Sequence, residues 1–184
     1  MDVIPIFNVG DYDAQLRRGA QLIRDGKLVV VPTETVYGGA ALLNHADGVA
    51  RLRALRGAGG KPFTIHLPRL DDAYRYLGDL PELGQRMMRK LWPGPVALMF
   101  DVPEARRREV AAAEGVAESD IYEGSTITLR FPDHIVTTDL LSQVAGPVAV
   151  TRAGANCVPS AAEILSMSLR PPGPRRWLMA SLRT

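Results

Sequence analysis

The chain lacks the features that are typical of secreted, zinc-bound or membrane-spanning proteins. Its 184 residues include one cysteine, Cys157, which excludes an internal disulfide and a zinc site built from cysteines. No apolar run reaches the roughly 20 residues that a membrane-spanning helix needs. The first residues also lack the charged start and long apolar stretch of a signal peptide. We therefore expect a cytoplasmic protein that makes no contact with a membrane.

The chain also has little excess of positive over negative charge, because its net charge is only +2. The whole molecule is therefore not a strong binder of polyanions. Basic residues nevertheless gather between Arg51 and Lys61, with no acid among them, and this cluster runs into a glycine-rich turn. Flexible backbone beside cations suits phosphate, whereas the alternative is a solvated helix face. The spacing of a P-loop is absent.

The order of apolar segments predicts one domain over residues 1–184, with an α/β (α+β) fold. Strands are expected at 28–31, 63–67, 95–101, 125–131 and 147–151. Helices are expected at 11–25, 46–56, 70–77, 82–91, 135–144 and 160–168. The charged, alanine-rich residues 103–124 predict a helix or mobile excursion outside the core, and the proline-rich tail 169–184 an extended or disordered end. Irregular alternation of strands and helices favours a twisted mixed sheet with flanking helices.

The most informative segment is Pro-Thr-Glu-Thr-Val-Tyr-Gly-Gly at residues 32–39, which follows the buried-strand pattern Leu-Val-Val-Val. A strand that ends here delivers three hydroxyls and two glycines into the interior or a cleft. Hydroxyls can bind a polar ligand, and glycines let a ligand or a second backbone approach closely. A tight turn that needs threonine and glycine only for its geometry is the alternative.

Several further segments occur along the chain in the same order as the motifs of a known family. They are Lys-Pro-Phe-Thr-Ile-His-Leu at 61–67, Trp-Pro-Gly-Pro-Val at 92–96, Thr-Leu-Arg-Phe-Pro-Asp-His at 128–134 and Gly-Pro-Val-Ala-Val-Thr at 146–151. Together with the segment at 32–38, they resemble the YrdC-like family of threonylcarbamoyl-AMP synthases over about residues 15–165. The family's C-terminal part has no match after Leu165. The resemblance implies a YrdC-like twisted mixed sheet around a positively lined cavity.

The resemblance implies an L-threonylcarbamoyladenylate synthase, a nucleotidyltransferase. Such an enzyme forms threonylcarbamoyl-AMP and pyrophosphate from L-threonine, bicarbonate or CO2, and ATP, for threonylcarbamoyladenosine in tRNA. Mg²⁺ would arrive with ATP, without a tightly bound protein metal site. A downstream tRNA threonylcarbamoyl transferase would be a partner, and tRNA or double-stranded RNA a possible ligand. The alternatives are a catalytically weak paralogue that binds nucleotide or double-stranded RNA, and a related transferase that uses a different small acid.

Three residues match the family's threonine-binding positions, namely Thr35, His66 and Arg130. Taken alone, Thr35 could be a turn hydroxyl and His66 a core residue whose ring is satisfied locally. An arginine at the end of a buried strand needs an anion. The threonine carboxylate can supply that anion as a bidentate partner, and the alternative is a structural ion pair with an Asp or Glu. We therefore expect the three side chains to converge on one cavity.

Five residues match positions that contact ATP, namely Arg56, Lys61, Thr126, Arg152 and Ser160. This chain departs from the family twice on that side. Glycines and an alanine at 57–60 replace the second basic residue of the family's turn. The family's Thr-Ser-Ala-Asn reads Thr-Arg-Ala-Gly at 151–154, and a two-residue insertion that retains Asn156 is the other alignment. Arg152 could replace the lost cation or fill the pocket. The sequence identifies no catalytic residue.

Overall fold

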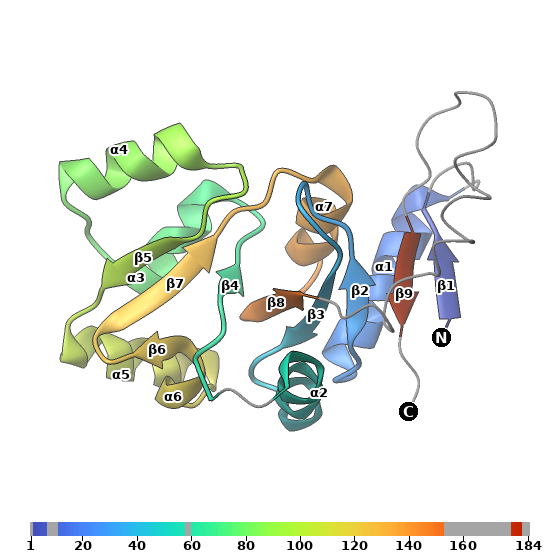
Figure 1. Cartoon of the computed structure of the whole chain (residues 1–184), viewed down its shortest axis with the longest axis horizontal. Coiled ribbons are helices and arrows are strands. Elements are labelled where there is room, and N and C mark those ends of the chain that lie inside the picture. Colours follow the sequence, from blue (N-terminus) through green and yellow to red (C-terminus); the bar gives the residue numbers. More distant parts are fainter. Residues whose placement is uncertain (1, 7–10, 58–59, 153–177, 182–184) are drawn as a thin grey trace.

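The computed structural model describes residues 2–6, 11–57, 60–152 and 178–181 (Figure 1). The helices are α1 (Tyr12–Arg24), α2 (Ala46–Arg56), α3 (Tyr74–Leu77), α4 (Glu82–Leu91), α5 (Glu104–Glu114), α6 (Glu118–Ile121) and α7 (Ile135–Ser142), with a 3-10 turn at Leu70–Ala73. The strands are β1 (Asp2–Pro5), β2 (Val29–Val31), β3 (Gly38–Leu42), β4 (Ile65–His66), β5 (Leu98–Asp101), β6 (Tyr122–Glu123), β7 (Thr126–Arg130), β8 (Val148–Arg152) and β9 (Leu178–Ser181).

The strands of the described residues form one mixed sheet in the order β1-β9-β2-β3-β8-β4-β7-β5, with β6 paired to β7. Strands β4 and β7 run parallel, and the remaining pairs run antiparallel. The sheet twists strongly from β5 to β1, with helices packed along it (Figure 1). The predicted mixed α/β fold with flanking helices is therefore confirmed. The extent of the domain over 1–184 stays a prediction.

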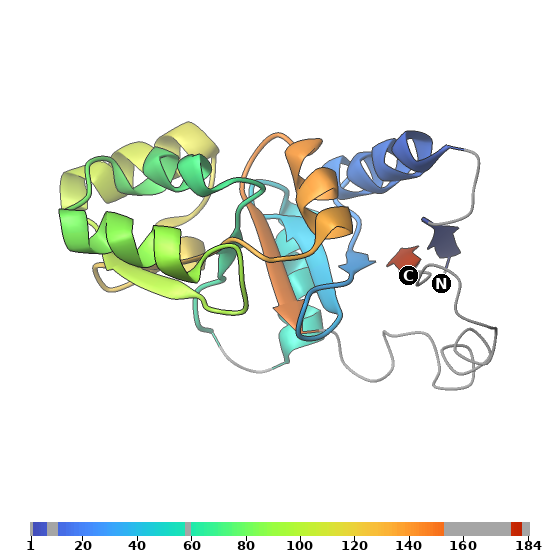
Figure 2. The ribbon, with the colours of Figure 1, turned by 90° about the horizontal axis from the view of Figure 1, so that it is seen from above.

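Helices cover both faces of the sheet around β3 (Figure 2). Ala40 and Leu42 join the apolar cluster that contains the inward residues of α1 and α7. The intervening Ala41 belongs to the other cluster, which includes Val49 and Leu52 of α2. Side chains alternate between the faces of a strand, so β3 is buried on both sides. Such a strand can carry small residues because its neighbours pack close to it.

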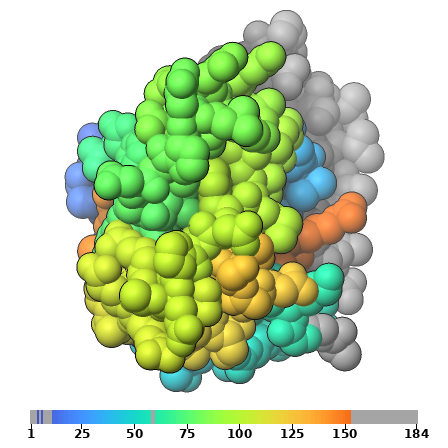
Figure 3. Space-filling view, turned by 90° about the vertical axis from the view of Figure 1, so that its left-hand side faces the viewer, coloured from blue at the N-terminus to red at the C-terminus, as the bar shows by residue number. Residues whose placement is uncertain are grey.

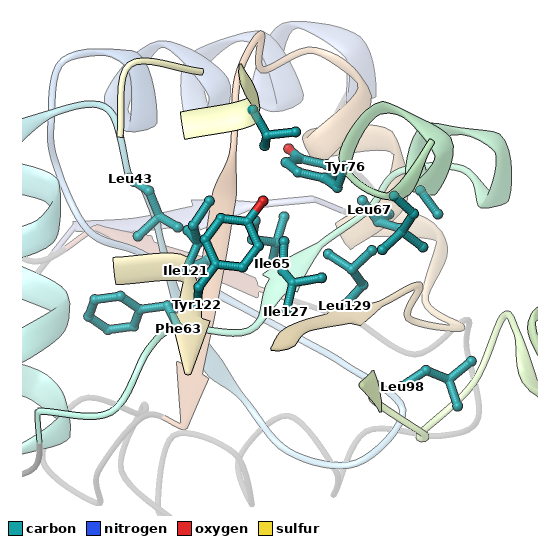
Figure 4. Packing of buried hydrophobic residues seen from close by; sticks show 14 of the residues in the cluster. Leu43, Phe63, Ile65, Leu67, Tyr76, Leu98, Ile121, Tyr122, Ile127 and Leu129 are labelled. Carbon is teal, nitrogen blue, oxygen red and sulfur yellow. The ribbon is translucent and has the colours of Figure 1, made fainter. Parts of the chain in front are cut away.

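Strands β4 and β7 meet in the larger of the two apolar clusters (Figure 4). Ile65, Ile127 and Leu129 are fully buried there. Tyr76 packs beside them from α3 and is 3% exposed. Burying a branched aliphatic side chain contributes roughly 1.5–3 kcal/mol, so these residues fix the two strands whose last residues, His66 and Arg130, are the predicted ligand contacts.

The prediction that residues 103–124 lie outside the core was wrong. This segment folds into α5, α6 and β6, and it buries Val110, Ile121 and Tyr122 against the larger apolar cluster. Together with α4, it covers one end of the molecule (Figure 3). The charges that suggested an excursion lie on the outer side of α5, where Arg108 pairs with Glu104. Only a narrow apolar stripe faces inward, which overall composition hides.

Several boundaries agree with the expectations and others do not. Helices α2 and α4 have the predicted bounds. The four strands β1, β3, β6 and β9 were not predicted, and β4 is shorter than 63–67. The predicted helix at 160–168 and the rest of the tail lie outside the described residues, apart from the extended residues 178–181. No helix in the described ranges is long and apolar enough to cross a bilayer.

Candidate functional site

The loop after β2 is ordered by its own hydroxyls. Thr33 is 9% exposed, and its hydroxyl donates to the carbonyl of Val36 at 2.6 Å. Because that donation uses its only proton, the 3.0 Å contact between the Thr33 and Thr35 hydroxyls requires Thr35 to donate. Thr137 of α7 donates to the carbonyl of Pro32 and anchors the start of the loop. The loop is therefore fixed by hydrogen bonds within it and by a hydrogen bond from α7.

The parallel pair β4–β7 places two predicted residues side by side. His66 and Arg130 are register partners, so their side chains leave the sheet on the same face. The backbone N–H of Leu67 donates to the carbonyl of Arg130 at 2.8 Å and continues this pairing. The backbone N–H of Gly94 donates to the carbonyl of Phe131 at 2.9 Å. That bond brings the turn at 92–96 against the end of β7.

Arg130 is held by three neighbours. Its side chain forms an ion pair with Glu34, and the two side chains are only 15% and 19% exposed. Its Nε donates to the carbonyl of Gly94 at 3.3 Å, and Nη2 lies 3.4 Å from the hydroxyl of Thr35. The anion that an arginine at this position needs is therefore supplied by a carboxylate of the loop that follows β2.

His66 is buried at 5% exposure, and its environment keeps the ring neutral. Desolvation lowers the pKa of His66 to about 4, and the positive charge of Arg130 acts in the same direction. The Thr64 carbonyl, 3.2 Å from Nδ1, and the charge of Glu34 oppose this shift. A carbonyl can only accept a hydrogen bond, so the neutral ring carries its proton on Nδ1, and Nε2 has a free lone pair.

Thr33, His66 and Arg130 line a cavity of about 180 Å³. Its polar wall consists of three hydroxyls, two guanidinium groups and one imidazole, which belong to Thr33, Thr64, His66, Arg130, Thr151 and Arg152. Gly38 completes the wall, where a Cβ atom would lie 2.3 Å from Cγ1 of Val150. The cavity can therefore hold a small polar ligand that carries negative charge.

The three predicted threonine contacts thus lie together. His66 and Arg130 line the cavity, and Thr35 contacts Arg130 although it does not itself line the wall. A larger cavity of about 240 Å³ also touches His66, but it contains no other predicted site residue. Its two arginines, Arg69 and Arg75, already pair with Asp72 and Glu114. The smaller cavity is therefore the better candidate site.

The predicted ATP contacts are more dispersed. Arg152 is exposed and lines the cavity beside Arg130. Arg56 donates to the carbonyls of Lys61 and Pro62 and lies 4.3 Å from the ring centre of Phe63, so it fixes the turn after residue 60. Lys61 is exposed, and Thr126 stands at the far end of β7 from Arg130. Ser160 lies outside the described residues.

No group of three or more His, Cys, Asp or Glu side chains within the described residues could hold a metal ion. The acidic groups near the cavity do not gather: Glu34 pairs with Arg130. The polar groups of the cavity wall are donors and hydroxyls rather than carboxylates. Their chemistry suits the binding of an anion.

A family model named Sua5/YciO/YrdC, with the description "Telomere recombination", matches residues 21–168. The chain belongs to the Sua5/YciO/YrdC family. It is 28% identical over 150 residues to threonylcarbamoyl-AMP synthase of Bacillus subtilis, covering 80% of this chain and 40% of that protein. A putative threonylcarbamoyl-AMP synthase of Mycobacterium leprae is 29% identical over 163 residues, covering 86% of this chain and 69% of that protein.

Solved structures of the Sua5/YciO/YrdC family resemble this fold. Sua5 of Pyrococcus abyssi in complex with L-threonine has a TM-score of 0.62 at 27% identity, covering 75% of this chain and 38% of that one. Escherichia coli YciO has a TM-score of 0.61 at 18% identity, covering 75% of this chain and 63% of that one, and supports the fold alone. The chain spans about 40% of the length of the first curated relatives that it matches.

Three residues that shape the site were not predicted individually as site residues from the sequence. Thr33 and Thr64 line the cavity, and Glu34 pairs with Arg130. The signal for Glu34 was its position between two hydroxyls directly after a buried strand. Nothing local showed that the loop reaches β7, because Glu34 and Arg130 are 96 residues apart.

Proposed function

We propose that the protein is an L-threonylcarbamoyladenylate synthase that uses L-threonine, bicarbonate or CO2, and ATP. It would form threonylcarbamoyl-AMP and pyrophosphate for threonylcarbamoyladenosine in tRNA. The observation that carries this proposal is that Arg130 and His66 line one small polar cavity, with the Thr35 hydroxyl 3.4 Å from Nη2 of Arg130. The family membership and the resemblance to Sua5 crystallised with L-threonine support it.

In this proposal the cavity binds threonine. Arg130 receives the carboxylate, through a charge-assisted hydrogen bond of roughly 1.5–3 kcal/mol. The Nε2 lone pair of His66 accepts a hydrogen bond from the side-chain hydroxyl of threonine. A neutral ring suits this role, because a protonated ring would have no lone pair to offer. The hydroxyl of Thr35 adds a further polar contact.

ATP would lie on the side of Arg152, with Lys61 as a further cation and Mg²⁺ carried by the nucleotide. The threonine nitrogen, once carboxylated, supplies the carbamate oxygen that attacks the α-phosphorus, and pyrophosphate leaves. Both reactants are anionic, so the chain contributes chiefly positioning and positive charge. We also propose that the protein acts in the cytoplasm, and that tRNA and a downstream tRNA threonylcarbamoyl transferase are its partners.

Pyrophosphate release from ATP tests the proposed reaction. We expect release with Mg²⁺, L-threonine and bicarbonate together, and little release when threonine or bicarbonate is omitted. Product mass confirms that an adenylate of carboxylated threonine has formed. Release that does not depend on threonine would contradict the proposal and would indicate a related transferase with a different small acid.

A catalytically weak paralogue that binds nucleotide or double-stranded RNA is the second candidate. Two sets of contacts favour it. Arg56 donates hydrogen bonds to backbone carbonyls of its own turn, and Arg130 already forms an ion pair with Glu34. Residues 57–60 add no further cation. Binding of ATP or RNA without any threonine-dependent pyrophosphate would support this candidate.

A further inference from the structure

Arg130 of the cavity wall is paired with a carboxylate, that of Glu34, which is not itself among the lining residues. Arg130 and Glu34 form an ion pair whose side chains are 15% and 19% exposed. His66 beside them is neutral at physiological pH, because burial lowers its pKa to about 4. A ligand that reaches Arg130 therefore meets a carboxylate as well, and its recognition depends on both charges.

We propose that Glu34 is a specificity-determining residue that binds the α-ammonium group of the amino acid while Arg130 binds its α-carboxylate. This inference rests on the proposed function and adds a residue to the threonine site. It assigns to the ion pair a second role beyond holding the loop. Glu34 comes from the same ordered loop as Thr35, so the loop would contact the amino acid through both side chains.

Glu34 affects a simple carboxylate and a zwitterion differently. A simple carboxylate that approaches Arg130 is repelled by Glu34, and at partial burial this repulsion is less screened than in bulk water. A zwitterion carries an ammonium group next to its carboxylate, so it can satisfy both members of the pair at once. Neither residue is then left as an unpaired, partly buried charge. Arg152, which also lines the cavity, attracts the carboxylates of both kinds of ligand alike, so the Arg130–Glu34 pair is what favours an amino acid over the corresponding hydroxy acid.

The geometry of the loop supports the proposed role of Glu34. The Thr33 hydroxyl binds the backbone N–H groups of Thr35 at 3.3 Å and Val36 at 3.1 Å, which fixes the backbone on the C-terminal side of Glu34. Arg130 is fixed independently by the carbonyl of Gly94 at 3.3 Å. Because each partner has its own anchor, a ligand can enter between the two charges without dismantling the site.

The experiment compares two ligands in three proteins by isothermal titration calorimetry. The ligands are L-threonine and 2,3-dihydroxybutanoate, in which a hydroxyl replaces the amino group. The proteins are the unsubstituted chain, Glu34→Gln and the control Glu82→Gln, which removes the same charge at an exposed position of α4. Circular dichroism confirms that all three are folded. The ratio of the two dissociation constants is read within each protein, so partial misfolding does not change it.

We expect Glu34→Gln to weaken threonine binding by roughly 10- to 150-fold, the range of a lost charge-assisted hydrogen bond. The hydroxy acid should bind this variant as tightly as before or more tightly, and Glu82→Gln should change neither constant. Tighter threonine binding by Glu34→Gln would overturn the inference, because it would mean that Glu34 competes with the ligand carboxylate. Equal weakening of both ligands would overturn it too.

The same titrations separate this inference from the proposed function. L-serine and L-valine are added as further zwitterions. If threonine-dependent pyrophosphate is absent but any of these amino acids binds in a Glu34-dependent way, the inference stands and the proposed reaction fails. If pyrophosphate is released but the ratio is the same in all three proteins, the reaction stands and the inference fails. If no amino acid binds, both fail.

Discussion

His66 makes a specific contribution to the pH dependence of stability. Its pKa in the folded protein is about 4, below the ordinary value of 6.5, because burial disfavours the charged ring. The unfolded chain therefore takes up a proton first as the pH falls below 6.5. The contribution of the neutral ring is fully present above that pH and is lost as the pH falls toward 4.

The size of the effect follows from linkage. With pKa values of 4 folded and 6.5 unfolded, the free energy of unfolding should fall by about 2 kcal/mol between about pH 6.5 and pH 4.5 through His66 alone. His134 has a pKa lowered by burial as well, and carboxylates titrate in the same range. The effect of His66 must therefore be isolated by a variant.

The matched variant is His66→Asn. The Asn amide nitrogen can replace Nδ1 as donor to the Thr64 carbonyl, while the side chain has no group that titrates. We expect the stability advantage of the unsubstituted protein over His66→Asn to shrink by about 2 kcal/mol from about pH 6.5 to pH 4.5. Urea unfolding followed by circular dichroism measures this difference at a series of pH values, with equal m-values as the check on two-state behaviour.

An advantage that stays constant over this pH range would contradict this prediction, because it would mean that His66 is not desolvated in the folded state. An advantage that grows on acidification would show that the folded state stabilises the protonated ring, through Glu34. Either result would also remove the neutral ring from the proposed threonine site, since the lone pair on Nε2 would no longer be available.

Three further substitutions test other contacts. Arg130→Ala should weaken threonine binding by roughly 5- to 150-fold, equivalent to about 1–3 kcal/mol, and leave ATP binding unchanged in calorimetric titrations; equal losses for both ligands would indicate a structural ion pair or a folding defect. Arg152→Ser should weaken ATP binding about fivefold, as for an exposed cation, with threonine binding intact; tighter ATP binding would mean that Arg152 fills the pocket. Arg75→Ala should lower the free energy of unfolding by about 1–3 kcal/mol, because Glu114, whose side chain is 3% exposed, loses its partner. The exposed control Arg69→Ala should cost less than about 1 kcal/mol, and equal costs would contradict the importance of burial.

Local patterns predicted the elements whose apolar residues follow a clear period. In α1, Leu16, Ala20 and Ile23 are buried as their spacing indicates, and Asp11 caps the helix by accepting from the N–H of Ala14 at 2.8 Å. Strand β3 was not predicted because its residues, Gly-Gly-Ala-Ala-Leu, have little intrinsic preference for strands. Its strand structure depends on pairing with β2 and β8, which no local window contains.

Strands β1 and β9 were missed for a related reason. Residues 2–5 pair with residues 178–181 across almost the whole chain, and β9 also pairs with β2. Each strand is four residues long. Short segments at such a separation give no signal of periodicity, so only the completed sheet identifies them. Within α4, Met87 is 42% exposed, whereas its neighbour Met88 is fully buried. Neighbouring helix positions cannot both face the same way.

The sequence predicted that His66 and Arg130 share one cavity, but not the charge that pairs with Arg130. The sequence showed that an arginine at the end of β7 needs an anion, and it left a ligand carboxylate and a protein carboxylate as alternatives. In the structure, the partner of Arg130 is the protein carboxylate of Glu34. A partly buried ion pair is a weak source of stability, because desolvation offsets much of the attraction, and apolar residues of similar volume often do as well. The Arg130–Glu34 pair is therefore poorly explained by stability alone. A ligand that carries both charges gives the pair a function, which is why the substitution of Glu34, more than that of Arg130, distinguishes a recognition site from a structural ion pair.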